Sequence, residues 1–190
     1  MTPDDHIGFA PQAITGPTYA CFNVLIPTLA AQPKGTYFAE LKDASATLLY
    51  SRVYVMPLAG GGATFGLSYS STSTSLGPVL WTAPLVYGQP YNIVIKYDPT
   101  SFTSTLWVNP STEADPSISQ TGAGPATVIT NFGLRQSASA STVPATYATG
   151  TANFTYSIDN LGVGTTFSDA CGLPVPARQA TWGALKSIYR

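Results

Sequence analysis

The amino-acid sequence predicts an all-β domain, built as a β-sandwich or a β-barrel. Short segments that alternate apolar and polar residues follow one another along most of the chain, and no long helical period interrupts them. Turn-forming residues separate the segments, since the 190 residues include 17 glycines and 16 prolines. With 44 % hydrophobic residues, one domain of this length can bury a core without a metal or a disulfide.

The first half of the chain supplies four predicted strands. They cover residues 19–26, 36–42, 48–56 and 64–70. The third and fourth strands flank the glycine-rich segment 59–62, so we expect them to pair as a hairpin.

The second half begins with the clearest hairpin of the chain. In residues 91–98 every second residue from Tyr91 to Tyr97 shares one apolar face, and in residues 103–109 Leu106 and Val108 share one. Asp98-Pro99 begins a turn between the two segments. Three more strands are predicted after this hairpin, and polar or proline-broken stretches are expected to be loops. The strands cover 128–136, 152–159 and 161–166, and the loops cover 70–75, 109–125 and 137–151.

The two cysteines, Cys21 and Cys171, lie near opposite ends of the chain. We predict a disulfide bond between them, and two separate buried thiols are the alternative. No CxxC motif or Cys/His cluster is present, and the single histidine, His6, stands near the N-terminus. Structural zinc and a catalytic cysteine are therefore not expected.

Charged residues are scarce, with eight basic and nine acidic side chains and a formal net charge of −1. The chain lacks the broad basic field that nucleic-acid binding needs, so we expect no nucleic-acid partner. No signal peptide and no apolar run of transmembrane length occur in the sequence. An extracellular or cell-surface location would mean that a signal was trimmed or that the chain is an excerpt.

Residues 174–190 form a separate, basic tail that follows Pro174 and Pro176. Its apolar residues recur with the spacing of a short amphipathic helix. The residues predicted to dock are Trp182, Leu185, Ile188 and Tyr189. The tail either packs on its own sandwich, remains flexible, or serves as a sorting or docking segment for another molecule.

Several segments occur in the order of a known group of domains. They are GTYFAELKDAS (35–45), SRVYV (51–55), FGLSYSSTS (65–73), YNIVIKYD (91–98), LWVNP (106–110), LRQ (134–136) and IDNLGVGTTFSD (158–169). Together they resemble the concanavalin A-like, laminin-G-like jelly-roll domains of bacterial secreted and surface proteins. The resemblance implies a two-sheet antiparallel jelly-roll β-sandwich over residues 1–173, with an opening strand missing or supplied from elsewhere, and the tail after it.

Glycoside hydrolases related to this fold carry two glutamates in the pattern E-x-D-x-(x)-E, because retaining cleavage needs paired carboxylates. Here Glu113-Ala114-Asp115 matches half of the pattern, and Pro116 follows where a central strand would continue. The second glutamate is absent, so the sequence predicts no enzyme of this type.

Laminin-G-like relatives often hold calcium on loops through Asp and Asn oxygens. Asp159 and Asn160 are the candidates here, and a tight turn between two strands is the alternative role for this pair. No D-x-D-x-D loop occurs, so no cofactor is expected unless these residues bind calcium.

Strand parity offers one candidate ligand face. Arg52 and Tyr54 point opposite to the apolar residues of their strand, as do Lys96 and Trp107 in theirs. We expect these four side chains to share the concave face, where an aromatic ring and polar groups would receive a ligand. The alternative is that a loop covers Trp107 and that the charges are simply solvated.

These features favour a non-catalytic extracellular surface or matrix module. It would act through protein–protein contacts with other subunits or with copies of itself, in adhesion or assembly, because an unpaired sheet edge is a template for strand addition. A lectin-like, carbohydrate-binding module is the alternative.

Overall fold

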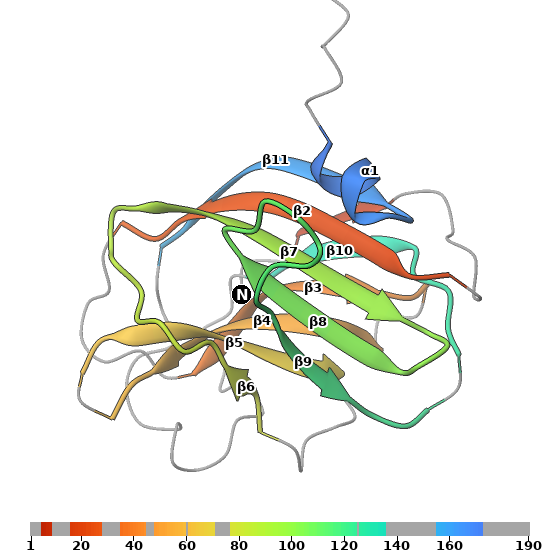
Figure 1. Cartoon of the computed structure of the whole chain (residues 1–190), viewed down its shortest axis with the longest axis horizontal. Coiled ribbons are helices and arrows are strands. Elements are labelled where there is room, and N and C mark those ends of the chain that lie inside the picture. The colour runs from red at the N-terminus through yellow and green to blue at the C-terminus, as the bar shows by residue number, and fades with distance from the viewer. Residues whose placement is uncertain are drawn as a thin grey trace, which may run out of the picture.

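The structure, a computed structural model, describes residues 5–8, 16–27, 35–44, 48–59, 61–70, 77–124, 126–135 and 155–172. These residues form two antiparallel sheets and one short helix (Figure 1). The six-stranded sheet has the order β1 (Asp5–Gly8), β10 (Asn131–Leu134), β3 (Thr36–Lys42), β4 (Leu49–Pro57), β5 (Ala63–Ser70) and β6 (Val79–Leu80). The five-stranded sheet has the order β11 (Ser157–Gly164), β2 (Thr18–Leu25), β7 (Pro90–Asp98), β8 (Thr103–Val108) and β9 (Ile118–Thr121). The predicted jelly-roll β-sandwich is confirmed.

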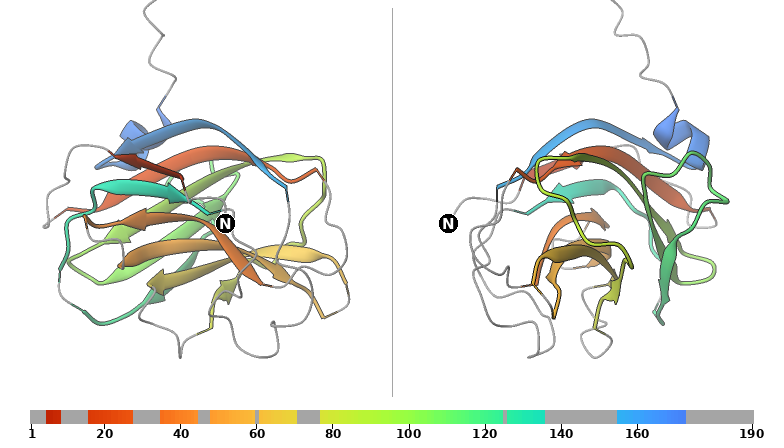
Figure 2. Two further views of the ribbon diagram at one scale, coloured as in Figure 1. Left: turned by 180° about the vertical axis from the view of Figure 1, so that it is seen from behind. Right: turned by 60° about the vertical axis from the view of Figure 1, so that its left-hand side comes forward.

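The main hydrophobic core lies between the two sheets (Figure 2). Each long strand sends every second residue inward, so Phe22 on β2 meets Phe132 on β10 with ring centroids 5.3 Å apart. Ile93 on β7 and Val53 on β4 are likewise fully buried. The alternation that predicted these strands therefore marks the inner face of each sheet.

A buried glutamine joins the two sheets at their β5 and β9 side. The side-chain oxygen of Gln120 accepts a hydrogen bond from the Tyr69 backbone nitrogen at 2.6 Å. The side-chain nitrogen of Gln120 donates a hydrogen bond to the Gly77 carbonyl oxygen at 2.9 Å. Strand β9 carries Gln120 in the five-stranded sheet, whereas Tyr69 belongs to β5 in the other. One side chain thus replaces the backbone pairing that the sandwich lacks between its sheets.

Both predicted hairpins are confirmed. Strand β4 pairs with β5, and β7 pairs with β8. In the second hairpin the Asp98 carboxylate accepts hydrogen bonds from the backbone nitrogens of Thr100 at 2.8 Å and Ser101 at 3.4 Å. Partial burial alone would raise the pKa of Asp98, but these hydrogen bonds outweigh it and lower the pKa. Asp98 is therefore a turn-forming residue.

Two predictions about the elements are wrong, and two short strands were missed. The predicted loop 109–125 contains β9, which is short and polar but gains its hydrogen bonds by pairing with β8. Asp159 and Asn160 do not form a turn between two strands, because β11 is one strand with a register shift between Asp159 and Gly162. Asn160 has φ 56° there, a left-handed conformation that asparagine tolerates. Strands β1 and β6 were not predicted, because four and two residues carry too little periodicity.

The outer face of the five-stranded sheet carries a second, smaller hydrophobic cluster under the helix α1 (Phe167–Cys171). Thr166 caps this helix, accepting a hydrogen bond from the Asp169 backbone nitrogen at 3.1 Å. Figures 1 and 2 show α1 lying outside β11 and β2, the two strands that it contacts most. The predicted disulfide is confirmed: Cys171 at the end of α1 is bonded to Cys21 on β2, with their Cα atoms 5.3 Å apart.

The predicted docking residues of the tail, Trp182, Leu185, Ile188 and Tyr189, lie outside the described residues, as does the rest of 174–190. Within the described ranges no helix is long and apolar enough to cross a membrane.

Candidate functional site

The four residues predicted to bind a ligand do not share one face, so that prediction is wrong in its geometry. Arg52 and Tyr54 lie on β4 of the six-stranded sheet, whereas Lys96 and Trp107 lie on β7 and β8 of the five-stranded sheet. Each pair points away from the core of its own sheet. Outward parity on two stacked sheets leads to opposite sides of the sandwich, which strand parity within one segment does not reveal.

Arg52 and Tyr54 belong to a cluster of arginines and tyrosines in which these two are buried, whereas Tyr37 and Arg135 are half-buried. The Arg52 guanidinium lies 5.3 Å from the Tyr37 ring centroid, and its Nε donates a hydrogen bond to Ser68 at 3.0 Å. Arg135 lies over the same Tyr37 ring at 4.4 Å. Burial is the largest influence on Tyr54 and raises its pKa. Since Arg52 is 2 % exposed and Tyr54 0 %, neither presents surface to a ligand in this conformation.

Trp107 lies under the loop that follows β8, the alternative considered for this residue. Its indole nitrogen donates a hydrogen bond to the Glu113 carbonyl at 3.2 Å, and its ring packs edge-on against Phe167 of α1 at 5.8 Å. The Glu113 carboxylate accepts from the Tyr19 hydroxyl at 2.6 Å and forms an ion pair with Lys96 at 3.2 Å. Glu113, half of the hydrolase-like pattern, therefore fastens this loop to the sheet.

The attachment of this loop should weaken in acid. The hydrogen bond from Tyr19, followed by the contacts with Lys96, outweighs partial burial and holds the pKa of Glu113 below its ordinary value of 4.5. A carboxyl with a lowered pKa stabilises the fold above its ordinary pKa, and the stabilisation is lost as the pH falls through the lowered value. We expect Glu113→Gln to lower the free energy of unfolding by about 0.5–1 kcal/mol at pH 7 and by much less at pH 3, because such exposed pairs contribute little. Denaturant unfolding of both proteins from pH 3 to pH 7 measures this, and an equal difference at both ends would contradict it.

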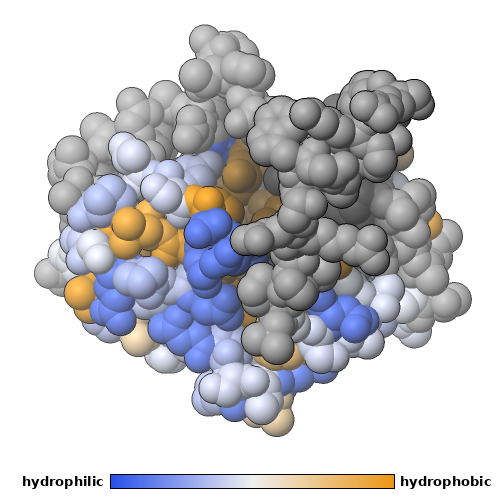
Figure 3. Space-filling view, turned by 90° about the horizontal axis from the view of Figure 1, so that it is seen from above, coloured by the Kyte–Doolittle hydropathy of each residue, from blue (hydrophilic) through white to orange (hydrophobic). Residues whose placement is uncertain are grey.

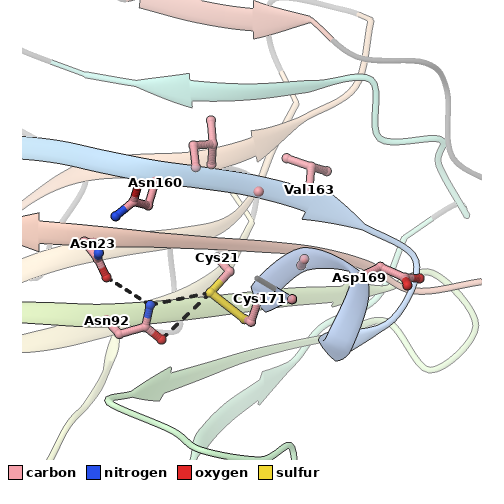
Figure 4. A pocket seen from close by; sticks show the side chains of 11 residues that line it. Cys21, Asn23, Asn92, Asn160, Val163, Asp169 and Cys171 are labelled. Atoms are coloured by element: carbon pink, nitrogen blue, oxygen red, sulfur yellow. Dashed lines mark hydrogen bonds between the residues drawn. A yellow bond between two sulfur atoms is a disulfide. The ribbon is translucent and has the colours of Figure 1, made fainter. Parts of the chain in front are cut away.

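An open cavity of about 530 Å³ lies beside the disulfide on the outer face of the five-stranded sheet. Its lining consists of Cys21, Asn23, Asn92, Asn160, Leu161, Gly162, Val163, Asp169, Ala170, Cys171 and Gly172. We call it the asparagine pocket. Figure 4 shows Asn23 and Asn92 meeting next to the Cys21–Cys171 bond, with Asn160 on β11 above them. Figure 3 shows the molecule from above, the side on which β11 and α1 lie in Figure 1. On this side a strongly hydrophilic band adjoins hydrophobic patches.

The three asparagines of the pocket lie on three neighbouring strands, β2, β7 and β11. Asn23 lies between the core residues Phe22 and Val24, and Asn92 lies between Tyr91 and Ile93, so both point outward. The register of β2 and β7 places Asn23 directly opposite Asn92. This register therefore brings together two amides that lie far apart in the sequence.

The bulge in β11 adds the third asparagine. Asp159 lies opposite Asn23, and the register shift that follows brings Asn160 to the same cavity. The Asn160 backbone nitrogen donates to the Asp159 carboxylate at 2.7 Å, which holds the bulge.

The pocket offers unused donors and acceptors. The Asn92 amide nitrogen donates to the Asn23 carbonyl oxygen at 3.1 Å and to the Cys21 sulfur at 3.6 Å. No other described side chain bonds the Asn23 amide nitrogen, the Asn160 carboxamide or the Asp169 carboxylate. Among the described residues, the lining contains one carboxylate and no lysine, arginine or histidine. This arrangement suits a neutral, hydroxyl-rich ligand and disfavours an anionic one.

The calcium prediction at Asp159 and Asn160 gains no further ligands from the structure. Among the described residues no three His, Cys, Asp or Glu side chains gather as a metal site. Ca²⁺ needs six to eight oxygen ligands, so these two residues do not make a fitting site by themselves.

Comparisons with known proteins bear on the fold alone. No family model matches the chain, and no curated protein matches it. Among solved structures, a sialidase superimposes with a TM-score of 0.53 at 13 % identity, over 87 % of this chain and 14 % of that chain. This chain shares its fold with part of a sialidase. Weaker likenesses are the heptameric SAP-like pentraxin from Limulus polyphemus (TM-score 0.49, 10 % identity, 86 % of this chain and 71 % of that one) and bacteriophage CBA120 tailspike protein 2 (0.46, 18 %, 87 % and 24 %).

Proposed function

We propose that this chain is a non-catalytic, carbohydrate-binding β-sandwich module that takes a neutral saccharide into the asparagine pocket. One observation carries the proposal: three asparagines and an aspartate line one open cavity, with hydrogen-bonding groups unused among the described residues. A carboxamide carries a donor and an acceptor side by side, which suits vicinal sugar hydroxyls. The volume of about 530 Å³ lies within the range usual for small-molecule pockets. The sialidase that shares this fold is consistent with a sugar ligand.

This proposal ranks above self-assembly through a sheet edge. Of the edge strands, β1 and β9 have four residues each and β6 has two. The remaining edge strand, β11, is interrupted by its bulge. Short and bulged edges are poor templates for strand addition. A laminin-G-like adhesive role through protein contacts is thus the second candidate.

An extracellular location belongs to the same proposal. The Cys21–Cys171 disulfide is typical of proteins that fold in an oxidising compartment. A saccharide-binding module would meet its ligand there.

Removing single amides should weaken saccharide binding. We expect Asn160→Gly and Asn92→Ala each to lower affinity about tenfold, the equivalent of one hydrogen bond. Glycine is chosen at position 160 because Asn160 has φ 56°, where alanine would be strained. A glycan array with neutral and acidic glycans identifies the ligand, and isothermal titration then compares the variants.

The matched control is Ser117→Ala, an exposed polar residue outside the pocket lining, which should leave affinity unchanged. Binding confined to acidic glycans, or binding that neither asparagine variant alters, would refute the proposal. Light scattering on the same samples tests the second candidate, which requires a concentration-dependent oligomer.

A further inference from the structure

We infer that α1 is a disulfide-fastened wall of the asparagine pocket, and that a dithiol reductant releases it and dismantles the site. This inference rests on the proposed function for its ligand and concerns the control of that same pocket. Four lining residues belong to α1 and its end, namely Asp169, Ala170, Cys171 and Gly172. The pocket therefore exists only while α1 lies on the sheet.

The helix cannot hold itself in place. It has five residues, far fewer than an isolated helix needs to form in water. Only Ala170 is fully buried in it, and Phe167 contributes edge-on contacts to Trp107 at 5.8 Å and to Tyr19 at 6.4 Å. Among the described residues, the disulfide at Cys171 is the covalent link between the far end of α1 and β2.

Release of α1 should be local. The residues beneath it are Tyr19, Cys21, Val94 and Trp107, which form a small cluster with Ala170 of α1 on the outer face. This cluster is separate from the core between the sheets. A satellite cluster of this size can open without unfolding the domain. The main core retains its buried residues from both sheets in that event.

The reaction itself is thiol–disulfide exchange. A thiolate of the dithiol attacks one cysteine sulfur, the S–S bond breaks, and a mixed disulfide forms with the other cysteine as the leaving thiolate. The second thiol of the reagent then closes to a cyclic disulfide. Two electrons pass from the dithiol to the protein, which ends with protonated Cys21 and Cys171. Both cysteines line the open pocket, and the attacked one is Cys171, because it is partly exposed whereas Cys21 is buried.

Binding and reduction must then be coupled in both directions. If the pocket binds saccharide only with α1 in place, a bound saccharide disfavours the release of α1 by the same free energy. At equilibrium, a given concentration of dithiothreitol should therefore reduce less of the disulfide in saturating saccharide than in its absence.

The first experiment needs no ligand. Dithiothreitol is added to the full chain in a Trp81→Phe/Trp182→Phe background, so that Trp107 is the only tryptophan. We expect a red shift of the emission and at least a tenfold faster amide exchange in residues 163–171, with the far-ultraviolet circular dichroism unchanged. A Cys21→Ser/Cys171→Ser variant should show the released signals without reductant and no further change with it.

The second experiment adds defined saccharides. Maltotetraose, cellotetraose and N,N′-diacetylchitobiose are titrated into oxidised and reduced protein, and we expect at least a tenfold loss of affinity on reduction. Unchanged emission and exchange, or loss of the whole β-sheet signal, overturns the inference while leaving the pocket proposal intact. Equal affinity in both states also overturns it. A third outcome separates the two proposals. If reduction releases α1 but the oxidised protein binds none of the three saccharides and no neutral glycan on the array, the disulfide-held position of α1 is supported and the carbohydrate proposal is not.

Discussion

Replacing Phe22 with alanine should lower the free energy of unfolding by about 3–5 kcal/mol, the usual effect of truncating a buried aromatic side chain. Phe22 is fully buried and packs on Phe132, so it connects the inner faces of both sheets. In a domain of this length each kcal/mol corresponds to roughly 2–4 °C in Tm, which gives a decrease of about 10 °C. Thermal and denaturant unfolding followed by circular dichroism measure it.

A conservative variant shows whether the loss of stability comes from the loss of buried apolar volume. Phe22→Leu keeps an apolar side chain at the same place and should lose less than half as much stability as the alanine variant. Trp107→Leu, in the small outer cluster, should disturb α1 more than the sandwich. If Phe22→Ala costs less than about 1 kcal/mol, the contact between the sheets is not the main core.

The sequence predicted the long strands well because one face of each is buried. In β2 and β7 the alternate apolar residues, such as Phe22 and Ile93, are buried in the core between the sheets. On the outer face, Tyr19, Cys21 and Val94 are buried as well, in the cluster under α1. The pattern is weak where burial is slight. Strand β9 has one buried residue, Gln120, which is polar, and its four residues read as loop.

The candidate site could be predicted only in part, because parity gives the side of a strand and not its partners. Parity correctly predicted that Arg52 and Lys96 point away from the core. It could not predict that their strands belong to different sheets, because the sequence of one strand does not determine its neighbours. The same limit hid the asparagine pocket. Asn23 and Asn92 each occupy an outward position in an alternating segment, and only the pairing of β2 with β7 brings them together. An outward amide in two alternating strands was the available signal.

Two glycines in β11 explain why the segment IDNLGVGTTFSD can carry α1. A Cβ at Gly162 would overlap the Ala170 carbonyl oxygen, and one at Gly164 would lie 2.6 Å from the Asp169 Cβ. The neighbours at both positions are mainly backbone atoms of α1, which cannot yield by rotating a side chain. Helix and strand are therefore in direct contact, and the close approach requires glycine at both positions.

Gly162→Ala should push α1 off the sheet and disable the pocket. We expect at least a tenfold loss of saccharide affinity, because Asp169 and Ala170 leave the lining, whereas the sandwich remains folded on its separate core. Faster amide exchange in residues 163–171 and slower formation of the Cys21–Cys171 bond should accompany the loss. Isothermal titration, hydrogen exchange and thiol counting during refolding measure the three effects.

Gly124→Ala is the matched control, because a Cβ there meets only the Tyr69 hydroxyl at an ordinary 3.8 Å. It should change neither affinity nor exchange. Should Gly162→Ala bind saccharide as tightly as this control, α1 would not be a wall of the site. The amides of β2, β7 and β11 would then have to hold the saccharide without Asp169, and Asn160→Gly would become the most damaging substitution instead.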